Sequence, residues 1–146
     1  MERNRDQSIL LSQILVVVFG VLLLALDFFA YRLSYHLLHD PRENVFLTVA
    51  IYVGSAFGWI CLWNLWRLLA NIRRGEVFQT KNATILRVLS WCCFFVGAEY
   101  FVFGVRWYIT LVLLSFAALF FGLILRVIKN VFEKAILLQE ENDYTV

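Results

Sequence analysis

The stretch Ile9–Tyr31, ILLSQILVVVFGVLLLALDFFAY, decides the fold class of this protein. A helix that crosses a bilayer needs about 20 mostly apolar residues, and this run is long enough. Its apolar residues are continuous rather than alternating, which argues against a membrane strand. No A-x-A-like cleavage site follows it, and it is too long for the apolar core of a signal peptide. We therefore interpret it as a retained transmembrane helix.

Three further runs of the same kind follow, and polar segments separate all four. Pro41 lies in the first break and discourages a helix through it, while Gly75 lies in the second and is a natural helix stop. The connection between the third and fourth runs is so short that these two helices must form a tight antiparallel hairpin. The sequence predicts an all-α membrane protein, a single domain 1–146 that forms an antiparallel four-transmembrane-helix bundle with spans at about 9–31, 45–69, 83–104 and 108–127.

The composition excludes a water-soluble domain. Apolar residues make up 62% of the chain and charged residues only 16%, so the polar surface is too small to cover the molecule in water. The three cysteines, Cys61, Cys92 and Cys93, all lie in apolar runs, where a thiol behaves as a small hydrophobic group. Their odd number implies no closed disulfide framework.

The distribution of lysine and arginine predicts the orientation. If both ends of the chain lie on one side of the membrane, that side holds 10 of the 13 basic residues, and the other side holds Arg32, Arg42 and Arg106. Basic residues are enriched in cytoplasmic segments of membrane proteins. We therefore expect a multi-pass membrane protein with both termini in the cytoplasm.

The fourth helix is predicted to continue beyond the membrane. Apolar residues recur at helical spacing after residue 127, with polar residues between them, and this pattern indicates an amphipathic cytoplasmic helix over 128–139. An acidic tail, QEENDYTV, is expected to follow the end of that helix. The stripe could pack under the bundle, lie on the membrane surface, or bind a cytoplasmic protein.

Four charged residues lie near the outer ends of the first and third spans. Helical rise places Asp27 and Glu99 at a similar level near the outer interface, with Arg32 and Arg106 one layer further out. We interpret this intramembrane charge cluster as ion pairing that fixes the first helix against the third. The alternative is a proton or cation site, since acids inside a membrane are often functional.

Other patterns in the chain are weaker. Gly54 and Gly58 form a small-xxx-small step that permits close helix packing, within the chain or in a homo-oligomer. His36, His39 and Asp40 have metal-like spacing, but nothing nearby completes the four ligands of a structural zinc site. The sequence contains no G-x-S-x-G, H-E-x-x-H or P-loop pattern. We expect no enzyme activity, no cofactor, no metal and no direct binding of nucleic acid.

Two motifs resemble those of a known family. The segment Asn71–Phe78, NIRRGEVF, followed by Asn82 and the stretch 87–91, resembles the signature of a bacterial family of small four-span membrane proteins of unknown function. The ending Glu140–Val146, EENDYTV, is similar to that family's terminal ENDLTV-like motif, with Tyr144 where leucine is more usual. The resemblance covers essentially the whole chain and implies no enzyme activity. Genes of this family are often found beside a gene for a small helix-turn-helix regulator, so the resemblance implies such a neighbour for this gene as well.

Both motifs fall on the side assigned to the cytoplasm, and this leads to a functional hypothesis. The protein would be a non-enzymatic regulatory or scaffolding component that binds a small cytoplasmic DNA-binding regulator through the 70–82 loop and the C-terminal tail. Alternatives are a transporter accessory, an immunity protein against a membrane-active peptide, and a small oligomeric channel. The candidate partner-binding residues are Arg73, Arg74, Glu76, Phe78, Glu140, Glu141, Asn142 and Asp143.

Overall fold

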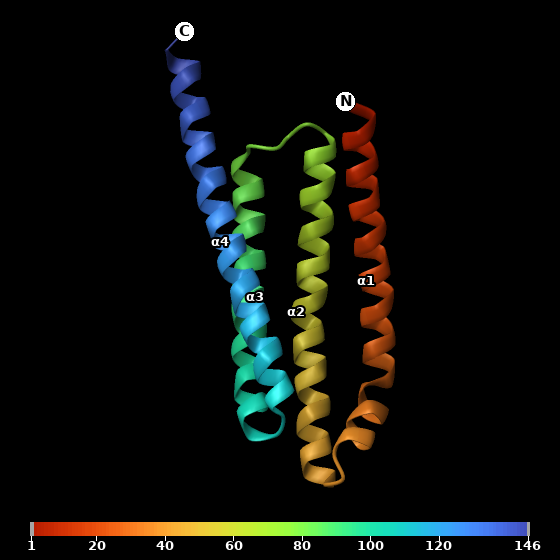
Figure 1. The fold of residues 1–146 in the computed structure, drawn as a ribbon. Coiled ribbons are helices and arrows are strands. Elements are labelled where there is room, and N and C mark those ends of the chain that lie inside the picture. The colour runs from red at the N-terminus through yellow and green to blue at the C-terminus, as the bar shows by residue number, and fades with distance from the viewer. Residues whose placement is uncertain (1, 146) are drawn as a thin grey trace.

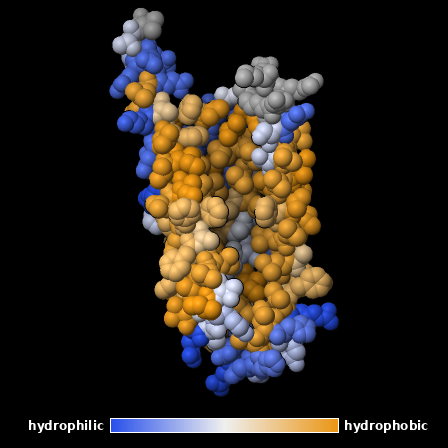
Figure 2. Space-filling view, in the orientation of Figure 1, coloured by the Kyte–Doolittle hydropathy of each residue, from blue (hydrophilic) through white to orange (hydrophobic). Residues whose placement is uncertain are grey.

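The computed structural model describes the backbone of residues 2–145 and the side chains of residues 6–145. Figure 1 shows four long antiparallel helices, and each is long and apolar enough to cross a membrane. The face that Figure 2 shows is apolar between two hydrophilic ends. The four helices of membrane-spanning length confirm the predicted all-α membrane fold. The helices are α1 (Glu2–Leu37), α2 (Pro41–Arg73), α3 (Thr80–Arg106) and α4 (Ile109–Tyr144).

The helix ends follow the local sequence. Asp40 caps the start of α2, since its side chain accepts a hydrogen bond of 2.9 Å from the backbone nitrogen of Arg42. Pro41 occupies the first position of this helix, where its missing N–H costs nothing. Gly75 has a φ of 81° just after α2 and ends that helix in the left-handed conformation that glycine adopts easily.

Helix α4 is longer than predicted. The predicted cytoplasmic helix ends at residue 139, but α4 continues without a break to Tyr144, so this predicted end was wrong. The segment Gln139–Tyr144 contains no glycine or proline, and its one glutamine and two glutamates are good helix formers. At 1.5 Å per residue the helix is roughly 54 Å long, well beyond the hydrocarbon thickness of about 30 Å. Its C-terminal part therefore projects from the bundle, as Figure 1 shows.

The helices pack in the order of the chain. Helix α1 packs on α2, α2 packs on α3, and α3 packs on α4, and the described residues give no contact between the backbones of α1 and either α3 or α4. The protein therefore consists of two hairpins, α1–α2 and α3–α4, which the α2–α3 interface joins. Away from the middle of the bundle, the Tyr108 hydroxyl donates a hydrogen bond of 2.6 Å to the Leu37 carbonyl and ties the two hairpins together.

Small residues bring α3 and α4 close together. A Cβ atom on Gly104 would lie 2.6 Å from the backbone nitrogen of Val112, so only glycine fits at this position. Two buried serines add hydrogen bonds between the helices: Ser90 Oγ donates to the Gly122 carbonyl at 2.9 Å, and Ser115 Oγ donates to the Gly97 carbonyl at 2.7 Å. Close backbone approach and such hydrogen bonds are what hold helices together in lipid.

The glycines of helix α2 serve packing within the chain. A Cβ atom on Gly54 would lie 2.8 Å from the hydroxyl of Tyr100 in α3, and one on Gly58 would lie 3.1 Å from the Leu23 side chain in α1. Neighbouring helices of the same chain already occupy both positions. The sequence left open whether this step packs within the chain or in a homo-oligomer, and in the structure it packs within the chain.

Candidate functional site

Both ends of the chain and the loop between α2 and α3 lie at one end of the molecule, which we call the terminal face (Figure 1). The loop leaves α2 by a tight turn. The backbone nitrogen of Gly75 donates to the Ile72 carbonyl, and that of Glu76 donates to the Asn71 carbonyl, each at 3.0 Å. These bonds satisfy carbonyls at the end of α2 and reverse the chain direction toward α3.

The buried side chain of Asn82 fixes the loop by hydrogen bonds. Its side chain is fully buried, and its amide nitrogen donates hydrogen bonds to the carbonyls of Glu76 at 2.6 Å and Val77 at 2.7 Å. Its side-chain oxygen accepts a third bond, of 2.8 Å, from the Asn71 amide at the end of α2. One side chain in the first turn of α3 therefore fixes both the loop backbone and the end of α2.

Aromatic packing connects the loop to α4. The rings of Phe78 and Phe132 meet edge to face with centroids 5.3 Å apart. Phe132 in turn packs against the core cluster that Leu68, Ile85, Leu86 and Leu89 form between α2 and α3. The loop, the α2–α3 interface and the projecting part of α4 therefore share one apolar core at the terminal face.

Charged side chains frame this region. Glu76 pairs with Lys81, and the Lys81 ammonium group lowers the pKa of the Glu76 carboxyl. Arg87 on α3 pairs with Glu133 on α4 at 3.0 Å, and the largely buried Lys129 lies 3.5 Å from the same carboxylate. Each exposed pair contributes little stability, because water and salt screen the attraction between the charges.

A recess lies between the loop and the C-terminal part of α4, and we call it the terminal recess. Its volume is about 420 Å³, and adjoining recesses of about 260 and 400 Å³ share lining residues with it. Of the predicted partner-binding residues, Phe78, Glu140 and Asp143 line the terminal recess, and Glu76 lines an adjoining one. The terminal recess is lined by Phe78, Gln79, Thr80, Lys81, Ile136, Gln139, Glu140 and Asp143.

The other four predicted residues lie outside the recesses. Arg73, Arg74, Glu141 and Asn142 are exposed on the terminal face, and none of them lines a recess. The predicted set lacks five residues that line the terminal recess: Gln79, Thr80, Lys81, Ile136 and Gln139. The helical spacing of Ile136, Gln139, Glu140 and Asp143 would have revealed one face of α4, had the predicted helix not ended at residue 139.

The two intramembrane acids do not meet. Asp27 accepts a hydrogen bond of 3.3 Å from the indole nitrogen of Trp59 on α2, and Glu99 on α3 lies beside Gly54. Helix α2 stands between α1 and α3, so the prediction that ion pairing fixes α1 against α3 was wrong. Arg32 and Arg106 are exposed, and no described residue forms an ion pair with either acid.

These acids nevertheless keep unsatisfied atoms. Asp27 Oδ1 and Glu99 Oε2 are both buried without a hydrogen-bond partner among the described residues, and so is the Ser55 hydroxyl. Among residues 6–145, no three histidine, cysteine, aspartate or glutamate side chains lie together as a metal site would require. Asp40, part of the metal-like spacing, instead caps α2.

Residues 8–146 match the model of a family described as "Protein of unknown function (DUF2975)". No curated protein and no solved structure matches the chain. The match spans nearly all of the sequence, from the first transmembrane helix to the C-terminal motif. This chain therefore belongs to the DUF2975 family.

Proposed function

We propose that this protein is a non-enzymatic regulatory or scaffolding component of a bacterial inner membrane, and that its terminal face binds a small cytoplasmic DNA-binding regulator. The observation that carries the proposal is the terminal recess, in which two motifs that are distant in the sequence line one surface. Phe78 comes from the first motif, and Glu140 and Asp143 come from the second.

The chemistry of this surface supports a protein partner. Phe78 is 47% exposed although it packs against Phe132, so part of its ring remains free for an apolar contact. Glu140, Glu141 and Asp143 are exposed and add negative charge along one end of α4. DNA-binding domains carry basic surfaces, and an acidic strip can compete with DNA phosphates for them.

The elements that carry the terminal recess are fixed in place, and this also favours binding of a partner. Asn82 fixes the loop, and α4 reaches the recess as one continuous helix. A preformed site loses little conformational entropy when a partner binds, which favours affinity. Leu137 is exposed and lines an adjoining recess, so it enlarges the apolar surface available to a protein.

The proposal can be tested by co-expressing this protein with the helix-turn-helix regulator that the family resemblance expects to be encoded by an adjacent gene. We expect the regulator to sediment with membranes that contain this protein and to stay soluble without it. The double charge reversal Glu140→Lys with Asp143→Lys should release at least nine-tenths of the bound regulator. Asp6→Lys, on α1 at the same end of the molecule, is the matched control and should retain it. A regulator that stays soluble with the unmodified protein would overturn the proposal.

A second candidate function rests on the unsatisfied intramembrane acids. Asp27 Oδ1 and Glu99 Oε2 are buried without partners, as they could be in a transporter accessory, a channel or an immunity protein against a membrane-active peptide. Truncation before Glu140 separates the two proposals, because it should abolish regulation and spare peptide resistance. For a channel, Glu99→Gln should remove the conductance measured in planar bilayers.

A further inference from the structure

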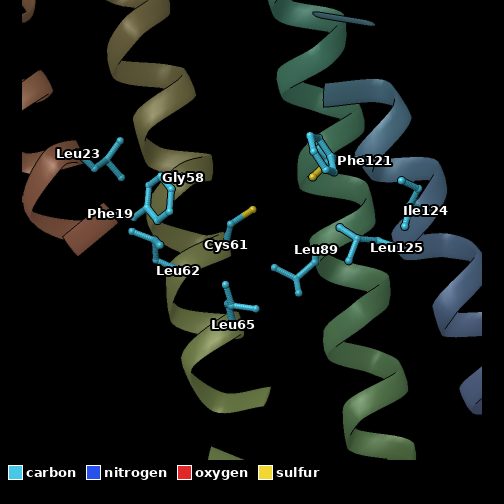
Figure 3. A pocket seen from close by; sticks show the side chains of 11 residues that line it. Phe19, Leu23, Gly58, Cys61, Leu62, Leu65, Leu89, Phe121, Ile124 and Leu125 are labelled. Carbon is cyan, nitrogen blue, oxygen red and sulfur yellow. The ribbon is translucent and has the colours of Figure 1, made fainter. Parts of the chain in front are cut away.

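A cavity of about 470 Å³ lies in the membrane-spanning part of the molecule, between α1 and α4 (Figure 3). Cys61 and Cys93 line it together with apolar and aromatic side chains, and none of its lining residues is charged. It offers only apolar contact, so it does not select one hydrophobic molecule over another. Charged side chains, which can select a ligand, lie instead between α3 and α4.

Three basic side chains of α3 and α4 share a single carboxylate. Arg87 on α3 lies 3.0 Å from the Glu133 carboxylate on α4, and the Lys129 ammonium group lies 3.5 Å from the same oxygen. The Arg126 guanidinium lies over the Trp91 ring, 5.2 Å from its centroid, and no carboxylate within residues 6–145 pairs with it. We call Arg87, Arg126, Lys129 and Glu133 the basic cluster, and it has an excess of two positive charges.

The charges of the basic cluster act together. Arg126 and Glu133 are seven residues apart on α4, which is two turns or roughly 10 Å. This is about one Debye length at physiological salt, so Arg87 and Lys129 add to the positive potential at Arg126. Glu140, the next acidic residue along α4, lies roughly 21 Å from Arg126 and is screened from it. The basic cluster therefore favours a ligand of net negative charge.

The basic cluster lies at the level of the lipid headgroups. Arg87 and Arg106 are 19 residues apart on α3, and Glu99 is the only charged residue between them. This separation is roughly 29 Å, close to the hydrocarbon thickness of about 30 Å. On α4 no charged residue lies between Ile109 and Arg126. Arg87 and Arg126 therefore mark the boundary at which hydrocarbon gives way to headgroups.

An aromatic strip leads from Arg126 into the membrane. Trp91 is 47% exposed, and Phe95, about one turn further along α3, is 56% exposed. Their ring centroids lie 6.1 Å apart, and Phe95 also stacks on Phe57 of α2 at 5.7 Å. Tryptophan is favoured at the membrane interface, and the exposed rings offer an apolar surface below the charges. Charge at one end and apolar surface at the other match the two parts of a phospholipid.

We propose that the basic cluster and the aromatic strip together bind one anionic phospholipid from the leaflet at the terminal face. Arg126 donates hydrogen bonds to the phosphodiester oxygens, since a guanidinium that stacks on a ring keeps the N–H groups at its edge free. Trp91 and Phe95 contact an acyl chain. The ammonium or choline group of a zwitterionic lipid would meet the excess positive charge unfavourably. This inference does not depend on the proposed function of the terminal face.

The experiment titrates the full chain in detergent micelles with dioleoyl phosphatidylglycerol or dioleoyl phosphatidylcholine, and native mass spectrometry counts the bound lipids. We expect one phosphatidylglycerol to bind about tenfold more tightly than phosphatidylcholine, because a charge-assisted contact is worth that much. Glycerol 3-phosphate, which has a phosphate but no acyl chain, should not displace it. Equal affinity for the two lipids would overturn the proposal, and so would displacement by glycerol 3-phosphate.

Two variants of equal charge test the position of the site. Arg126→Gln should weaken phosphatidylglycerol binding about tenfold and leave phosphatidylcholine binding unchanged. Lys134→Gln is the matched control and should stay within about twofold of the unmodified protein, because Lys134 is exposed and lies about 100° around α4 from Glu133. Equal losses in the two variants would overturn the proposal, since any surface cation would then suffice.

A third variant keeps every charge. Trp91→Leu removes the ring that Arg126 stacks on, and phosphatidylglycerol binding should weaken about threefold. Circular dichroism should show unchanged helix content in all three variants, because Arg126, Trp91 and Lys134 are not buried. Unchanged phosphatidylglycerol binding by both Arg126→Gln and Trp91→Leu would place the lipid elsewhere and overturn the proposal.

Discussion

The Asn71 amide donates a hydrogen bond of 2.8 Å to the side-chain oxygen of Asn82, and this contact joins the last turns of α2 to the first turn of α3. Asn82 uses its own amide to bind two loop carbonyls, so a single residue organises the connection between the hairpins. The same connection carries Phe78 to the edge of the terminal recess. The stability of the fold and the shape of the proposed binding surface therefore depend on one buried side chain.

We predict that Asn82→Ala destabilises the protein by about 2 to 4 kcal/mol, since it removes three hydrogen bonds and leaves buried polar groups unsatisfied. Denaturant or thermal unfolding in detergent micelles measures this loss. Asn130→Ala is the control, because Asn130 is exposed on α4, and it should change stability by less than about 0.5 kcal/mol. Equal effects of the two substitutions would contradict the assigned role of Asn82.

Two glycine-to-alanine substitutions, one at Gly104 and a control at Gly20, test the packing of the α3–α4 hairpin. Gly104→Ala places a Cβ atom 2.6 Å from the Val112 nitrogen, where backbone must move, and we expect a loss of about 1 to 3 kcal/mol. At Gly20 the same substitution meets the Trp59 ring at an ordinary distance of 3.8 Å. Gly20→Ala should be neutral or stabilising by up to about 1 kcal/mol, because alanine favours a helix. Matching melting temperatures for the two variants would contradict the close approach of α3 and α4.

The ion pair in the loop predicts a dependence on pH. Lys81 lowers the pKa of Glu76 in the folded protein, so the unfolded chain binds a proton more readily. The stability from this pair is full above the ordinary pKa of a glutamate and is lost as the pH falls through the lowered folded value. Melting temperatures of the unmodified protein and Glu76→Gln should therefore differ at neutral pH and converge in acid. Glu141→Gln, which keeps the pair, should follow the unmodified protein across the whole range.

Membrane orientation is predicted from the basic residues and can be measured directly. In a variant with all three native cysteines replaced by serine, a cysteine introduced at Gln79 should resist an impermeant maleimide added to intact cells. A cysteine at His39, at the opposite end of the molecule, should react with it. Permeabilised cells should label both positions. Labelling of Gln79→Cys from outside would reverse the topology and exclude a cytoplasmic role for the terminal face.

The sequence by itself determined the number of helices, their approximate limits and the class of the protein, because the length and hydropathy of a segment are local properties. It also placed both motifs at one end, since four antiparallel spans return the chain to the side where it began. Only the tertiary structure decided that α2 separates Asp27 from Glu99 and that Cys61 and Cys93 line the same cavity. Lipid tails are as apolar as leucine, so hydropathy alone does not choose which helices become neighbours. Close fits such as Gly104 against Val112 make that choice, and they exist only once the helices have packed.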